Sequence, residues 1–275
     1  MPAAYAHHRF GQDVRALLPP EDQAVLTDHA ELFAIGLQGP DILFHYHPLR
    51  ANSVTRLGHG MHERPGREFF RPAAEKFRRD GAQPRDLAYL LGFLCHFLLD
   101  TFCHGYVEEQ ARTGPVSHVA METAFDRMLM VRDGLDPLVH RPAAVLTASQ
   151  TNAALIAGFF PSLTAGEVRR AIRGMVRDGD LMRAPGRGKE ALLTAGLKLA
   201  GQYETLGGLM VTRREDPRCR ESTRVLWTLY QQALPRAAVL VQEYRHYLAG
   251  QGSLAPLYEQ TFVPRSAGEE RGNRL

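Results

Sequence analysis

A long apolar run, Leu87 to Val107, dominates the hydrophobic pattern of this chain. His96, Asp100 and His104 interrupt the run at intervals of four residues. Successive members drift by only about 40° around a helix, so the three side chains share one stripe. A membrane span would not carry an acid and two histidines, so we predict a buried helix over about Pro84 to His104. Polar groups there need partners. A metal ion would satisfy all three at once, and ordinary hydrogen bonds are the alternative.

The rest of the pattern is also helical. Apolar residues recur at helical spacing, and Gly or Pro residues separate the segments. We predict helices over 11–18, 21–33, 66–79, 118–131, 151–160, 164–177, 189–211 and 221–248. The stretch from His45 to Gly60 is predicted to be a loop, and Gly105 is predicted to end the central helix. No useful run of alternating residues indicates a strand.

These elements predict an all-α fold, a multi-helix bundle with a metal cluster in its helix core. We expect one domain over residues 1–262, with a metal-binding half at about 1–135 and a helical completion at about 150–250. Residues 263–275 are charged and are predicted to form a disordered tail.

Composition changes this picture little. The chain is 44% hydrophobic and 23% charged, which is an ordinary globular profile. A net charge of +3 gives no specific nucleic-acid signal, although a pI near 8.8 permits transient contact with an anionic membrane surface. The start shows no secretory signal, and three cysteines make no paired framework. We therefore expect a cytoplasmic protein with reduced thiols. The oligomeric state stays open.

The histidines are distributed unevenly along the chain, because eleven of the twelve lie at or before His140. His118 and Glu122 form a second pair at i, i+4, which alone would more simply be a surface contact. Asp41, after Gly-Pro, would alone be a helix cap. Two such pairs on antiparallel helices can face each other across a bundle. Mixed imidazole and carboxylate ligands suit zinc. Six candidate ligands suffice for two ions, with His7 available for a third: His62, His96, Asp100, His104, His118 and Glu122.

The order His, Asp, His, His-x3-Asp, His, His-x3-Glu resembles the zinc-dependent phospholipase C family, an all-helical trinuclear zinc fold. Four phrases resemble a signal-less bacterial branch of that family: Met-Pro-Ala-x-Tyr-Ala-His, Ile-Gly-Leu-x-Gly-Pro-Asp-Ile-Leu-Phe, Met-His-Glu-Arg and Gly-Phe-Leu-Cys-His-Phe-Leu-Leu-Asp-x3-His. The match covers residues 1–135 strongly and the later helices loosely.

The resemblance implies two or three zinc ions. One would be held by His62, His96 and Asp100, and Asp100 would bridge toward a second metal. The second site would consist of His104, His118 and Glu122.

The resemblance also implies an amino-terminal histidine ligand, His7. The matching phrase Met-Pro-Ala-x-Tyr-Ala-His favours His7 over His8. Asp41 would match the family's catalytic carboxylate, which orients or deprotonates water. His62 is favoured over His59 by its His-Glu-Arg context.

Three departures from the secreted members affect these expectations. Those enzymes use a processed N-terminal residue as a ligand, whereas this chain begins with Met-Pro, so the third metal is in question. They have two more residues between the helix aspartate and the next histidine, whereas here His104 stays on the helix. The expected lack of a leader removes easy access to extracellular phospholipid.

We therefore hypothesise a zinc-dependent phosphodiester hydrolase resembling phospholipase C, with phospholipid among its candidate substrates. Zinc would activate water for attack on phosphorus. One alternative is a nuclease or nucleotidase with the same zinc chemistry, which would need aromatic stacking positions in a basic groove. Another is a helical metal-binding protein without turnover.

Overall fold

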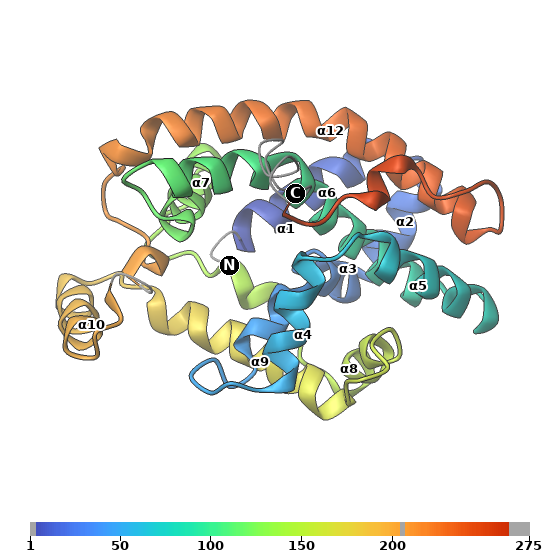
Figure 1. Cartoon of the computed structure of the whole chain (residues 1–275), viewed down its shortest axis with the longest axis horizontal. Coiled ribbons are helices and arrows are strands. Elements are labelled where there is room, and N and C mark those ends of the chain that lie inside the picture. Colours follow the sequence, from blue (N-terminus) through green and yellow to red (C-terminus); the bar gives the residue numbers. More distant parts are fainter. Residues whose placement is uncertain (1–3, 204–206, 264–275) are drawn as a thin grey trace, which may run out of the picture.

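The computed structural model describes residues 4–203 and 207–263. Within these ranges the chain consists of α-helices and short 3-10 helices (Figure 1). No β-strand occurs in these ranges, and extended pairing is limited to an isolated antiparallel bridge between Pro65 and Thr261. The predicted all-α fold is confirmed.

The twelve N-terminal and middle elements follow one another with short connections. They are α1 (Ala4–Ala16), α2 (Pro20–Asp28), α3 (Ala30–Gly36), η1 (Gly39–His45), α4 (Ser53–His62), α5 (Arg67–Arg79), α6 (Pro84–Thr113), α7 (His118–Arg132), η2 (Pro142–Val145), α8 (Gln150–Ala157), α9 (Ala165–Met182) and α10 (Arg187–Leu199). The C-terminal part adds η3 (Gly207–Leu209), η4 (Pro217–Cys219), α12 (Arg220–Leu248) and η5 (Pro256–Glu259).

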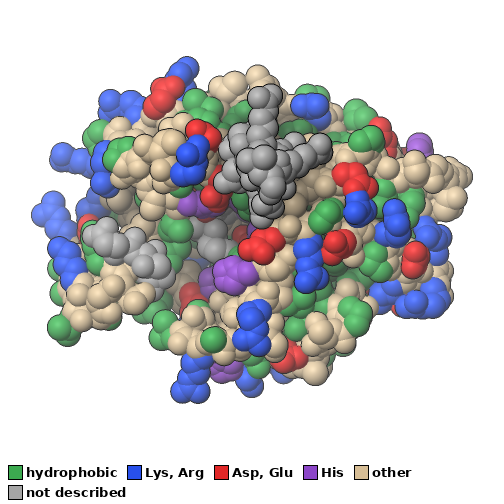
Figure 2. Space-filling view, viewed as in Figure 1, with side chains coloured by type: hydrophobic (Ala, Val, Ile, Leu, Met, Phe, Trp, Pro, Cys, Tyr) green, Lys and Arg blue, Asp and Glu red, His purple; other side chains and the backbone are tan. Residues whose placement is uncertain are grey.

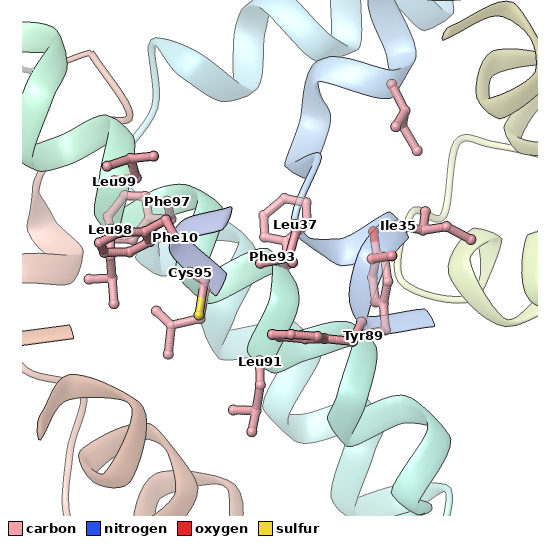
Figure 3. Close-up of a cluster of buried hydrophobic side chains, with 14 of the residues drawn as sticks. Phe10, Ile35, Leu37, Tyr89, Leu91, Phe93, Cys95, Phe97, Leu98 and Leu99 are labelled. Atoms are coloured by element: carbon pink, nitrogen blue, oxygen red, sulfur yellow. The ribbon is translucent and has the colours of Figure 1, made fainter. Parts of the chain in front are cut away.

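Helix α6 is the centre of the core. It is long and apolar enough to cross a membrane, but 94% of its most apolar 18-residue window is buried inside the protein. Apolar side chains of neighbouring helices, including Phe10 of α1 and Ile35 of α3, pack close to its own aromatic rings of Tyr89, Phe93 and Phe97 (Figure 3). The predicted helix is therefore a core helix that other helices cover (Figure 1).

Helix α3 crosses α6 at two glycines. A Cβ added to Gly36 would lie 2.3 Å from the carbonyl oxygen of Tyr89, and one added to Gly92 would lie 2.4 Å from that of Phe33. Both helices can approach this closely only because neither carries a side chain at the crossing. The contact positions the following turn, η1, beside the middle of α6.

The first helix begins earlier than predicted. The expected start near Gly11 is wrong, because α1 begins at Ala4 and buries Tyr5, Ala6, His7 and Phe10. Its free N-terminal amides are capped from a distance: Asp126 of α7 accepts hydrogen bonds from the backbone of Tyr5 (3.1 Å) and Ala6 (2.8 Å).

The predicted loop before Gly60 is also wrong in part. Residues Ser53–His62 form helix α4, and the side chain of Asn52 caps it by accepting a hydrogen bond from the amide of Thr55 at 2.9 Å. Two glycines in the helix weaken the sequence signal. The predicted helix over 21–33 divides at His29 into α2 and α3.

Several helix ends differ from the prediction. Helix α8 ends at Ala157 and not at 160, and α9 continues past 177 to Met182. Gly105 does not end α6, which continues to Thr113. The helix predicted over 189–211 ends at Leu199, and residues 204–206 lie outside the described part. Most of the predicted tail, 264–275, also lies outside it. The division into a metal-binding half and a helical completion stays a prediction.

A C-terminal segment closes over α6. The amide of Gly66 donates to the carbonyl of Gln260 at 2.9 Å, next to the Pro65–Thr261 bridge. Phe262 is 1% exposed, and its ring lies 4.8 Å from that of Phe97. Residues from the far end of the chain thus become part of the core beside the histidines of α6.

Candidate metal centre

Five elements bring the predicted site residues together. His7 comes from α1, Asp41 from η1 and His62 from α4, while α6 and α7 supply the remainder: His96, Asp100, His104, His118 and Glu122. Histidine and acidic side chains lie around a hollow near the middle of one face (Figure 2). The functional groups themselves are mostly hidden, since His96 is fully buried and Asp100 is 2% exposed.

Asp100 is the hub of the cluster. Its Oδ2 lies 3.0 Å from Nε2 of His96 and 3.9 Å from Nε2 of His62. Its Oδ1 lies 3.3 Å from Nε2 of His7 and 3.5 Å from Nε2 of His104. One carboxylate therefore faces four imidazole nitrogens from three helices.

Glu122 organises the second part of the cluster. Its Oε1 lies 3.0 Å from Nε2 of His104 and 3.0 Å from Nε2 of His118. The two rings lie 5.1 Å apart. Because His104 also faces Asp100, the two parts of the cluster are continuous.

The ligand atoms form three groups in which all atoms lie within 4.8 Å of one another. The groups are His7 with His96 and Asp100, Asp41 with His62 and His96, and His104 with His118 and Glu122. The third group has the predicted composition. The expected set of His62, His96 and Asp100 is instead divided between the first two groups.

Asp41 lies within one of the three groups of candidate ligands, in addition to its predicted catalytic role. Its Oδ1 is 3.0 Å from Nε2 of His62, so it is a candidate ligand as well as a candidate base.

The two alternative histidines lie elsewhere. His59 is exposed on α4 and its ring packs on Phe44 at 4.4 Å. His8 belongs to none of the three groups.

Backbone carbonyls set the orientation of three histidines. The Nδ1 of His62 lies 2.8 Å from the carbonyl oxygen of Gly58, that of His96 lies 3.3 Å from Leu37, and that of His104 lies 3.2 Å from Phe262. A carbonyl only accepts, so each Nδ1 carries the proton and each Nε2 faces the carboxylates. Metal-binding histidines are oriented in this way.

A carboxylate orients the fourth histidine. Nδ1 of His118 donates to Oε1 of Glu108 at 2.7 Å, while its Nε2 faces Glu122. Carboxylate–histidine–zinc arrangements have this form.

Several buried polar atoms in the cluster lack hydrogen-bond partners among the described residues. They include Nδ1 of His7, Nε2 of His96 and Oδ2 of Asp100. The last two are 3.0 Å apart but are not aligned for a hydrogen bond. Buried polar atoms without partners are costly, and coordination would satisfy both Nε2 and Oδ2. The donor set of imidazole nitrogens and carboxylate oxygens fits zinc.

Electrostatics keep the carboxylates charged. Burial alone would raise the pKa of Asp100, but His104, His96 and His7 together hold it well below its usual value. Burial opposes protonation of His118, yet Glu122 and Glu108 raise its pKa to about 10. In the metal-free protein His118 is therefore protonated at neutral pH and pairs with Glu108 and Glu122.

A glycine makes room for the central ring. Gly39 has φ +51°, and a Cβ there would lie 2.2 Å from Cδ2 of His96. The Gly-Pro-Asp sequence thus serves two purposes. Its glycine admits the imidazole of α6, and its aspartate enters the cluster two residues later.

Sequence reasoning missed the partners that orient the histidines, which are Glu108 and the backbone carbonyls of Gly58, Leu37 and Phe262. Glu108 lies four residues after His104 on the part of α6 that was predicted to be outside the helix, and that spacing was a usable signal. Phe262 contributes its backbone carbonyl, for which no sequence signal exists.

The fold and the cluster define an all-helical protein with a buried histidine–carboxylate centre suited to zinc. A sequence model of the family described as zinc dependent phospholipase C matches residues 6–164, more than half of the chain. The protein belongs to this family. The matched range contains every residue of the cluster. No curated protein and no solved structure matches the chain.

Proposed function

We propose that this protein is a zinc-dependent hydrolase of phosphodiesters, with phospholipids as the substrate class. Family membership supports the reaction type. The observation that carries the proposal is the single carboxylate of Asp100, which faces four imidazole nitrogens at 3.0 to 3.9 Å in the core. A purely structural zinc site would need only one closed set of four ligands.

The three groups described above would hold the zinc ions. Bound zinc supplies two effects in such a centre: it polarises phosphoryl oxygens, and it lowers the pKa of water toward about 7. The protein holds the imidazoles with Nε2 directed inward through the carbonyls of Gly58, Leu37 and Phe262.

Asp41 is the group we assign to proton transfer. It is 7% exposed, and although burial opposes its charge, His96 and His62 keep its pKa below the usual value. It is therefore a carboxylate at neutral pH. Such a group can orient an attacking water by accepting a hydrogen bond and can take its proton.

We also propose that the protein works in a reducing, cytoplasmic compartment. Its three cysteines, Cys95, Cys103 and Cys219, are all free and buried. Burial raises the pKa of the Cys95 thiol to about 12, so this thiol stays protonated and unreactive.

Metal counting combined with a diester panel tests the function. The purified full chain is analysed for zinc and assayed on phosphatidylcholine vesicles, single-stranded DNA and bis(p-nitrophenyl) phosphate. We expect two or three zinc ions, hydrolysis of the lipid and the generic diester, loss of activity on chelation, and recovery with zinc. Activity that survives complete chelation would refute the proposal. A preference for DNA would support the nuclease alternative instead.

Helix α4 offers a matched pair of variants for this assay. His62→Ala removes a cluster histidine, whereas His59→Ala removes an exposed histidine three residues earlier on the same helix. We expect the first variant to lose zinc and hydrolysis and the second to keep both. Equal behaviour of the two variants would contradict the assignment of the cluster.

A further inference from the structure

Helix α10 exposes leucines to water. It lies at one edge of the molecule (Figure 1), and none of its residues is buried. Leu192 is 73% exposed and Leu199 is 92% exposed. Leu199 follows Leu192 by two heptad-spaced turns, so the two side chains point in nearly the same direction, about 20° apart. Large apolar side chains that are exposed together mark interaction surfaces.

The two leucines belong to an apolar stripe on the outer side of α10. This outer stripe consists of four exposed residues: Ala191, Leu192, Ala195 and Leu199. Leu193 and Leu197 fall on the opposite side of the helix and are half-buried. A helix that only completed the fold would be polar on its outer side. The outer stripe therefore needs a second explanation.

Basic residues flank the outer stripe on both edges. Arg187 and Lys198 are exposed and lie about three turns apart along one edge, and Lys189 lies at the other edge. The acid of α10, Glu190, is on the side that faces the protein, where its Oε2 accepts a hydrogen bond from Nε of Arg213 at 2.8 Å. The outer side of α10 is therefore apolar along its middle and positive at its edges.

A shallow depression on α10 collects part of this positive charge. Its charged residues are Arg187, Glu190, Lys198 and Arg213. Because Glu190 pairs with Arg213, the charge of the depression comes from Arg187 and Lys198. Phosphate groups of lipids bind at such clusters of basic side chains beside apolar surface.

A second copy of the chain is the competing partner for the outer stripe. Two stripes packed on each other would bring the same basic residues of both copies to one interface, and like charges repel there. An anionic lipid surface attracts these cations instead. Their aliphatic stems can cover apolar surface while the charged ends reach the phosphate groups.

We propose that α10 docks the protein on an anionic lipid surface. Leu192 and Leu199 enter the boundary between head groups and acyl chains, and the flanking cations lie among the phosphate groups. Helices with this distribution of residues lie in the plane of a membrane surface. The choice of lipid as the partner rests on the proposed function, but the docking itself needs no hydrolysis.

Cosedimentation with vesicles tests the docking. The zinc-loaded full chain is mixed with vesicles of phosphatidylcholine alone or of phosphatidylcholine with phosphatidylglycerol, and the bound fraction is measured before hydrolysis proceeds. A cation near an anionic surface contributes about fivefold to binding, so we expect the mixed vesicles to bind at least about tenfold more tightly. Added salt should weaken this binding. Equal binding to both vesicles, or binding to neither, would overturn the proposal.

Paired variants test the leucines. Leu192→Ala with Leu199→Ala shortens the outer stripe and keeps good helix formers, whereas Leu17→Ala with Leu49→Ala removes leucines that are 55% and 88% exposed outside α10. We expect the first double variant to lose about tenfold or more in binding to the mixed vesicles and the second to bind like the wild type. Equal binding by the two double variants would refute the role of α10.

A second pair of variants tests the charges. Arg187→Gln with Lys198→Gln should lose about tenfold or more on the mixed vesicles and little on phosphatidylcholine alone. Arg64→Gln with Arg79→Gln removes two cations that are 64% and 71% exposed outside α10, and it should bind like the wild type. Undiminished binding of the first double variant would refute the role of these cations.

A soluble substrate separates this inference from the proposed function. The leucine variant of α10 should hydrolyse bis(p-nitrophenyl) phosphate like the wild type and should act about tenfold or more slowly on mixed vesicles. If no variant hydrolyses any diester but vesicle binding still depends on α10, the enzyme assignment fails and the docking surface stands. Sedimentation of the free protein tests the competing partner. A dimer that the leucine variant dissociates, together with no vesicle binding, would overturn the proposal.

Discussion

Removing the carboxylate behind His118 should weaken one zinc site selectively. Glu108 accepts the Nδ1 proton of His118 at 2.7 Å, and in Glu108→Ala this histidine loses the group that orients its ring. Loss of such a partner typically lowers metal affinity 10- to 100-fold, or about 1.4 to 2.7 kcal/mol. Because the Glu108 side chain is 47% exposed, water replaces part of the interaction, and we expect a value near tenfold. Glu108→Gln keeps an acceptor oxygen and should lose less.

The neighbouring residue provides the control. Glu109 is similarly exposed, at 41%, and pairs with Arg112 on the surface, so Glu109→Ala should bind zinc like the wild type. Competition with a chromophoric chelator, with zinc equivalents counted, measures each affinity. We expect one zinc equivalent to weaken in Glu108→Ala and the others to remain. If Glu108→Ala and Glu109→Ala bind every equivalent alike, the orienting role is wrong.

Three further predictions concern the cluster. Asp41→Asn should lower kcat at least 100-fold, as expected for a lost general base, while the group around Glu122 keeps its zinc. Steady-state kinetics measures kcat and metal analysis measures the zinc content. A near-normal kcat would contradict the role of Asp41 as the base. Gly39→Ala should lower the Tm more than Gly134→Ala. Both positions have positive φ, but a Cβ at Gly39 would lie 2.2 Å from His96, whereas nothing lies within 4 Å of one at Gly134. Calorimetry measures both Tm values, and equal shifts would disprove this prediction. Zinc affinity should rise with pH from 6 to 9, because the pKa of His118 is raised to about 10 without metal and its proton competes with zinc at every pH below that value. A titration in two buffers would detect the released protons, and pH-independent affinity would contradict this.

Local spacing predicted the central features of this protein. The interval of four residues between His96, Asp100 and His104 is a property of one helix, and the structure places all three on one buried stripe of α6. The pair His118 and Glu122 follows the same rule and faces His104. Periodicity suffices for such residues because the helix itself fixes their relative positions.

Contacts between distant segments could not be predicted in this way. Asp126, about 120 residues later, caps the first amides of α1. The residues near the start of the helix therefore carry no signal of where it begins. The orientation of His104 depends on the carbonyl of Phe262, and every residue type carries a carbonyl. The division of the ligands into groups depends on how α4 and η1 approach α6, which only tertiary packing determines.

The burial of Asp100 would slow the exchange of any metal ion bound beside it. Asp100 is 2% exposed and His96 is fully buried, so an ion bound between them would leave slowly. Exchange requires a local opening of the covering helices, and such openings in a core are rare and slow. Zinc bound there would therefore exchange with a chelator or with added zinc at the rate of this opening.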